Sequence, residues 1–272
     1  SDRNPAAWEW IWALPFDKSF APKNPFIDLF SPVGGSYLLK PSQEAIDNWN
    51  SQTQRNGFPF DARGRFTYRT IGGRPVVMKY LYNYINADGI PLLSLNDRNG
   101  KWFLYRAATM HLHYAEAANR DGRHKIAWAL VNNGINAAFD DPNNPDKTNS
   151  QQTHDVPPYD FMARSGGTPG TPTFTDPWYR GTGIRGRAYV TNLPVAGDST
   201  LAIEDMIINE GALETAYEGH RWSDLLRVAM RRNDPSYLAD KVYAKLQKDG
   251  VPNAAQARAK LMAGDWYLPF KW

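Results

Sequence analysis

The clearest periodic pattern of the chain lies between residues 207 and 230. Glutamates recur there at every fourth position, at Glu210, Glu214 and Glu218, so on a helix they would line one face. A second stretch, after Gly219, places apolar residues at helical spacing: Trp222, Leu225, Leu226 and Ala229. The pattern predicts two helices hinged at Gly219. Because stacked carboxylates repel one another, we also expect cations at the joint, and the candidates are Arg221, Arg227, Arg231 and Arg232.

Two further helices are predicted in the middle of the chain, over residues 102–119 and 123–139, with a turn at Asp121 and Gly122. In the first helix we expect an apolar face made of Phe103, Ala107, Met110, Tyr114 and Ala117. A polar stripe has the same spacing: Arg106, Thr109, His113, Glu116 and Arg120. Together the two helices predict an antiparallel hairpin of tetratricopeptide type. Because one hairpin cannot bury both of its faces, we expect residues 207–230 and the last helices of the chain to cover it.

The N-terminal part of the chain alternates with period two. Trp8, Trp10, Trp12 and Leu14 occupy every second position, which predicts a short strand. The tryptophan row has two interpretations, packing in the core and a platform for flat sugar rings, and we favour the core.

Shorter signals complete the pattern. Residues 16–35 are rich in proline and glycine and predict a loop. Ser42 is the predicted N-cap of the next helix, and residues 61–63 predict a turn with an ion pair. Residues 76–85 favour a strand, with a helix as the alternative. Two short helices are predicted near the C-terminus, at residues 236–248 and 254–262.

Residues 142–199 differ from the rest of the chain because glycine, proline and short polar side chains dominate them. They predict a long irregular excursion, which compact domains rarely carry without a use for it. The length of 272 residues allows one large domain or two small ones. We expect one mainly α-helical domain over residues 1–272, with long irregular loops and a few short strands.

Composition narrows the functional classes. The net charge is only +3 and the charges of both signs are interspersed, which argues against nucleic-acid binding. Cysteine is absent, so disulfides and thiolate metal sites are excluded. No apolar run approaches the ~18 residues of a membrane span, and the first residues lack the pattern of a signal peptide. Aromatic residues make up 13% of the chain, and such residues often line surfaces that stack on flat ligands.

The segment 207–230 resembles the signature near the C-terminus of the SusD/RagB family, the surface glycan-binding lipoproteins of Bacteroidetes. That signature is roughly E-R-x-x-E-L-a-f-E-G-h-R-w-f-D-L-x-R. The chain departs from it at Gly211, where the family usually has Arg, and at Ser223, where it usually has an aromatic residue. The matching residues are Glu210, Glu214, Glu218, Gly219, His220, Arg221, Trp222, Asp224, Leu225 and Arg227.

Other segments resemble the same family. The stretch G-I-R-G-R, residues 183–187, is similar to one that precedes the signature, and the terminal D-W-Y-L-P-F is similar to the family's closing W-Y-L-P-I. The predicted hairpin is similar to a helical motif of the family, in which Thr109 here replaces a usual Glu. The residues that match this motif are Arg106, Ala107, Leu112, Tyr114, Ala115, Glu116, Ala117 and Asn119.

The resemblance implies a fold of tetratricopeptide-like helical hairpins and a non-catalytic role. Such proteins capture oligosaccharides at the cell surface and deliver them to a SusC-type TonB-dependent transporter of the outer membrane. Because family members are longer lipoproteins, made with a signal peptide and a lipidated cysteine, the resemblance implies that this chain corresponds to their C-terminal half. It implies no cofactor.

Two places could supply a sugar site, which needs exposed aromatic faces and polar partners for hydroxyl groups. One is Trp178, Tyr179 and Arg180 in the long excursion. The other is Trp49 with Asn50, near the end of the helix that Ser42 begins. For each, the alternative interpretation is an aromatic residue that pins its loop onto the helices.

Two other functional classes remain as alternatives. A glycoside hydrolase could use Glu210 and Glu214, although nearby arginines would keep both ionised, whereas catalysis needs one of them protonated. A helical-repeat scaffold would bind only protein. A metal site at His111, His113 and Glu116 is disfavoured, because the two histidines point in different directions on a helix.

Overall fold

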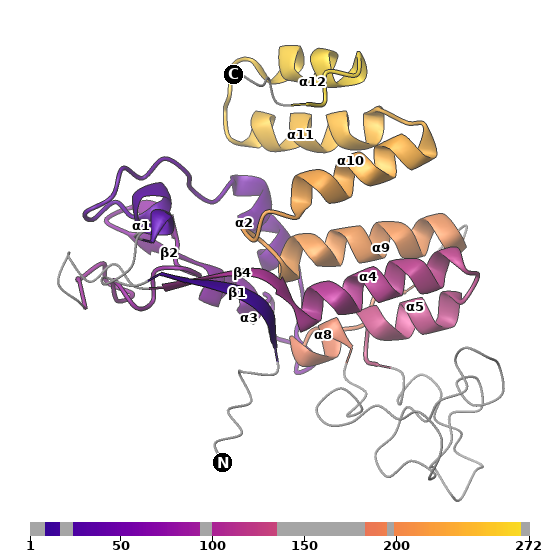
Figure 1. The fold of residues 1–272 in the computed structure, drawn as a ribbon, viewed down its shortest axis with the longest axis horizontal. Coiled ribbons are helices and arrows are strands. Elements are labelled where there is room, and N and C mark those ends of the chain that lie inside the picture. The colour runs from indigo at the N-terminus through magenta and orange to yellow at the C-terminus, as the bar shows by residue number, and fades with distance from the viewer. Residues whose placement is uncertain (1–8, 17–23, 93–99, 135–182, 195–198, 268–272) are drawn as a thin grey trace, which may run out of the picture. The chain divides into compact units, whose positions relative to one another are not determined.

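The structure, a computed structural model, describes residues 9–16, 24–92, 100–134, 183–194 and 199–267. In these residues the chain is about half helical, with ten helices and four strands that form two small sheets (Figure 1). The expectation of a mainly helical protein with a few short strands is therefore confirmed. The chain divides into two compact units. Unit 1 comprises residues 1–51, 62–105 and 215–272, and unit 2 comprises residues 52–61 and 106–214.

Unit 2 is built around three long helices and one short one. They are α4 (Ala107–Arg120), α5 (His124–Val131), α8 (Ile184–Arg187) and α9 (Ser199–Glu214). Helices α4 and α5 form a hairpin across the turn at Gly122, whose φ of +78° suits glycine, and α9 packs on both of them (Figure 1). The predicted pair of packed helices is present, although the second helix ends at Val131 and does not reach residue 139. Of the segments expected to cover the pair, the part of residues 207–230 that lies in α9 does so, whereas α11 and α12 pack within unit 1.

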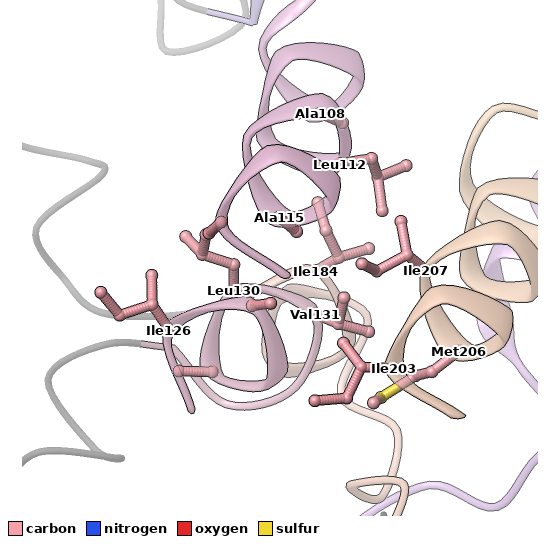
Figure 2. Close-up of a cluster of buried hydrophobic side chains, with 13 residues drawn as sticks. Ala108, Leu112, Ala115, Ile126, Leu130, Val131, Ile184, Ile203, Met206 and Ile207 are labelled. Atoms are coloured by element: carbon pink, nitrogen blue, oxygen red, sulfur yellow. The ribbon is translucent and has the colours of Figure 1, made fainter. Parts of the chain in front are cut away.

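Aliphatic side chains from all four helices meet in the core of unit 2 (Figure 2). Small residues on α4, among them Ala108, Ala115 and Ala118, let the neighbouring helices approach closely. The larger residues that fill the space between them are Leu112, Ile126, Leu130, Val131, Ile184, Ile203, Met206 and Ile207.

Two predictions for α4 were wrong. The helix begins at Ala107, because residues Gly100–Arg106 form strand β4 instead. Its buried face is also different, since Met110 and Ala117 are exposed while Thr109 and Glu116 are buried. The sequence places apolar residues around most of the helix, so helical periodicity fits two faces, and packing against α5 and α9 selects one of them.

Unit 1 contains both sheets. Strand β1 (Trp10–Phe16) pairs with β4, and β2 (Tyr68–Ile71) pairs antiparallel with β3 (Arg74–Val77). The core of this unit is aromatic: Phe26 stacks on Tyr80 with the ring centroids 4.2 Å apart. The period-two pattern thus predicted β1 correctly. Of the strand favoured over residues 76–85, only Val76 and Val77 lie in a strand, at the end of β3, and most of the residues that follow form turns.

Three short helices of unit 1 precede β4: α1 (Pro25–Phe30), α2 (Gln43–Asn50) and α3 (Ala62–Thr67). The side chain of Ser42 accepts a hydrogen bond from the Ala45 amide and caps α2, as predicted. The expected loop at residues 16–35 contains α1, which begins because Asn24 caps it and Pro25 occupies its first turn. Likewise α3 replaces the turn expected at residues 61–63.

The C-terminal helices of unit 1 are α10 (Arg221–Arg232), α11 (Ser236–Lys248) and α12 (Ala254–Met262), and each packs on the next (Figure 1). The bounds of α11 and α12 agree with the prediction. The two helices expected on either side of Gly219 are also confirmed, as α9 and α10. Since α9 ends at Glu214, however, Glu218 lies in the connection and does not extend the helical row of glutamates. None of the helices in the described ranges is long and apolar enough to cross a membrane.

Candidate functional site

A fully buried ion pair joins α8 to α9. Nη1 of Arg185 lies 2.7 Å from Oε2 of Glu210, and the two side chains are 1% and 0% exposed. The guanidinium also donates to the carbonyl oxygen of Thr191 at 2.7 Å and to Oε1 of Gln52 at 2.9 Å. A charge removed from water requires such partners, because the desolvation of each ion costs several kcal/mol. Arg185 therefore holds α8 and two connecting segments onto α9.

A second pair lies one helical turn further along α9. Nη1 of Arg106 lies 2.8 Å from Oε1 of Glu214, and Nη2 donates to the backbone carbonyl of the same residue at 2.7 Å. Arg106 is the residue directly before α4, so this pair fixes the start of α4 to the end of α9. The guanidinium bonds to a carbonyl at the helix C-terminus, where the macrodipole favours positive charge.

Glu218, in the connection that follows α9, is held by contacts within unit 1. Nζ of Lys79 forms an ion pair with Glu218 and lies 3.3 Å from the carbonyl oxygen of Ala216. The neighbouring Tyr80 donates from its hydroxyl to the carbonyl oxygen of Tyr217 at 3.1 Å. Tyr217 has a φ of +63°, which is uncommon for a bulky residue, and these contacts hold the connection in that conformation.

Each of the three glutamates therefore has a cationic partner, but in three separate pairs, and these cations come from distant parts of the chain. Arg185, Arg106 and Lys79 were not among the four arginines that we named for this role. Of those four, Arg227 pairs with Asp224 within α10, at 3.0 Å. Helical spacing predicts which glutamates lie on one face of a helix. It does not predict their cationic partners, because these come from segments that meet the helix only in the folded protein.

The histidines of α4 lie apart from each other. His111 is buried while His113 is exposed, and Glu116 is paired with Arg120 one turn away. Burial and, to a smaller extent, the charge of Arg187 lower the pKa of His111 from 6.5 to about 3, against the opposing effects of the Leu130 backbone and Glu214. His111 is therefore a neutral core residue near pH 7. Within the described parts of the chain, no three His, Asp or Glu side chains are grouped as a metal site requires.

Of the predicted sugar-binding residues, Trp49 is buried, with 1% of its surface exposed, and Asn50 is exposed beside it. The indole packs beneath Gly64 of α3 and stacks on Tyr68 at 5.8 Å between ring centroids. This geometry favours the alternative interpretation, in which Trp49 anchors its segment. Trp178, Tyr179 and Arg180 lie outside the residues that the structure describes.

The tryptophan row of β1 differs from our expectation. Trp10 is 38% exposed and Trp12 is 62% exposed, so the core interpretation was wrong for these two residues, while Trp8 lies outside the described range. Ile11 and Leu14 are exposed as well. The sequence did hold a sign of this exposure, because apolar residues occupy both faces of the strand. In a two-stranded sheet, a strand of this kind can bury only part of its side chains.

The chain was compared with protein families, with curated proteins and with solved structures. No protein-family model matches the chain, and neither the curated proteins nor the solved structures contain a significant match to it.

Proposed function

We propose that this chain is the C-terminal region of a SusD/RagB-like protein, which captures glycan nutrients without cleaving them. Captured oligosaccharide would pass to a SusC-type TonB-dependent transporter. The full-length protein would then lie on the cell surface of the outer membrane, held by a lipid anchor in its N-terminal part. Recognition would rest on aromatic stacking and on hydrogen bonds to hydroxyl groups, with no cofactor.

The observation that carries this proposal is the pair of ion bridges on α9. The resemblance rests on three separate segments: the signature with Glu210 and Glu214, the G-I-R-G-R segment with Arg185, and the helical motif with Arg106. In unit 2, Arg185 pairs with Glu210 and Arg106 pairs with Glu214. Three segments that separately resemble one family are thus joined by ion pairs in the structure. If the resemblance were accidental, there would be no reason for the matching residues to contact one another.

The packing of α4, α5 and α9 supports the finer expectation of tetratricopeptide-like architecture. In such repeats each helical hairpin exposes a face that the next helix covers. Here α9 covers the α4–α5 hairpin through Ile203, Met206 and Ile207 (Figure 2).

The same ion pairs support binding rather than hydrolysis. A glycosidase keeps one carboxylic acid protonated at the substrate and leaves the other accessible to the sugar. Glu210 is fully buried and paired with an arginine, and Glu214 is bound by another. These contacts support a structural role for both carboxylates over a catalytic one.

Affinity electrophoresis tests the proposal. The protein is run through gels that contain plant, host or microbial polysaccharides, beside Trp178→Ala and Trp49→Ala. We expect one class of glycan to retard it. Loss of retardation in folded Trp178→Ala would assign a sugar site to the excursion. Trp49→Ala should unfold more easily, because its indole is buried.

A second experiment tests the partner. The full-length protein should copurify with a TonB-dependent transporter. A protein that binds neither glycan nor transporter would contradict the proposal and favour a protein-binding scaffold.

A further inference from the structure

The sheet formed by β1 and β4 presents exposed aromatic side chains. Residues two apart on a strand share a face, so Trp10 and Trp12 lie on one side of β1, about 7 Å apart along the strand. Trp12 is the more open of the two, at 62% exposed. Large rings that remain in water forgo the free energy of burial, so an exposed pair on one face points to a binding surface.

A cation lies on this surface. Nζ of Lys101, on β4, lies 3.7 Å from the centroid of the Trp10 ring, and Phe103 packs against the same tryptophan at 5.2 Å between ring centroids. Lys101, Phe103 and Trp10 therefore share a face of the sheet. The ammonium covers one side of the Trp10 ring, so Trp12 offers the freer ring for stacking. The side chain of Lys101 is itself exposed, which leaves its charge accessible to a ligand.

We propose that Trp12, Trp10 and Lys101 form a binding site for an anionic polysaccharide. The apolar face of a sugar ring would stack on Trp12, and a carboxylate or sulfate of the same chain would pair with the Lys101 ammonium. This inference rests on the proposed function, since it names the class of glycan. The choice of an anionic ligand follows from charge complementarity, because a neutral glycan would use the rings and would offer the Lys101 ammonium no negative charge.

The experiment compares polysaccharides that differ only in charge. Polygalacturonate is compared with its methyl-esterified form, and dextran sulfate with dextran. The first pair tests recognition of a carboxylate, and the second pair tests recognition of a sulfate. Affinity electrophoresis and calorimetry are carried out on the unaltered protein and on Trp12→Ala and Lys101→Gln. Trp222→Ala is the matched control. Trp222 lies on α10, outside this surface, and 42% of the residue is exposed.

We expect the unaltered protein to bind the charged member of at least one pair more tightly, and added salt to weaken that binding. Trp12→Ala should weaken it about tenfold, the equivalent of about 1.4 kcal/mol, while Trp222→Ala leaves it unchanged. Lys101→Gln should remove the preference for the charged member. Equal binding of charged and neutral members, or full binding by Trp12→Ala, would overturn the inference while the proposed function stands. Retention on no glycan overturns the inference too, and copurification with the transporter then decides the proposed function separately.

Discussion

Arg185 donates a hydrogen bond to Oε2 of Glu210 across 2.7 Å, and neither side chain is more than 1% exposed. The pair connects α8 to α9 in the interior of unit 2. Buried pairs are seldom better for stability than apolar residues of the same volume, but removing one partner leaves the other charge buried and uncompensated. The Glu210 carboxylate is thus the counter-ion of a guanidinium that is buried with it.

Glu210→Gln should lower the free energy of unfolding by about 3–5 kcal/mol, because the guanidinium of Arg185 loses its counter-ion. The control is Asp224→Asn, which breaks the partly exposed pair with Arg227 and should cost about 0–1 kcal/mol. Urea unfolding of the three proteins measures both effects. Equal losses in the two variants would show that the buried pair has no special role.

Glu214→Gln separates a structural glutamate from a catalytic one. We expect the unaltered protein to release no shorter product from any glycan that it binds, and the variant to unfold at lower urea concentration, because Arg106 loses an ionic partner. Product analysis and urea unfolding are done on the same samples. Turnover by the unaltered protein that disappears in a variant of unchanged stability would instead support the glycoside hydrolase.

Gly64→Ala should destabilise the protein by about 1–3 kcal/mol, since overpacking forces the surroundings to shift. An added Cβ at this position would lie 2.7 Å from Cβ and Cγ of Trp49, too close for a normal contact.

Gly211→Ala is the matched control, at a helical glycine where the resemblance expects a larger residue. Here the nearest atom to an added Cβ is Cδ1 of Leu112, at 3.8 Å, so we expect about 0.4–1 kcal/mol of stabilisation. Thermal unfolding of the two variants should move in opposite directions, and a shared direction would contradict the packing described around Trp49 or α9.

His111 makes stability depend on pH. Its pKa in the folded protein is about 3, below the ordinary 6.5, so between these values the unfolded chain binds a proton that the folded protein does not. Stability is therefore fully present above pH 6.5 and falls as the pH drops toward 3, by at most about 1.4 kcal/mol per pH unit. His111→Phe should flatten this slope, whereas His113→Phe, at an exposed position, should keep it. Equal slopes in all three proteins would contradict a buried neutral His111.

Helical periodicity and capping predicted much of the fold, including Ser42 as a cap and the limits of α11 and α12. Periodicity was less reliable in α4, where apolar residues surround the helix and two faces fit equally well. It also failed at residues 102–106, because a strand that pairs with a distant segment overrides local helical preference. In the candidate site, the glutamates were visible from their spacing, but Arg106, Arg185 and Lys79 reach them only through the fold. The exposure of Trp12 likewise depends on how many strands join β1.

The proposed function requires that the protein binds a glycan and leaves it intact, and native mass spectrometry measures both properties in one experiment. The protein is incubated for hours with oligosaccharides from whichever polysaccharide retards it, and the masses of the complex and of the recovered sugar are measured. We predict a complex of one protein with one oligosaccharide of unchanged mass. Shortened oligosaccharides, or a protein that forms no complex with any of them, would contradict the proposed function.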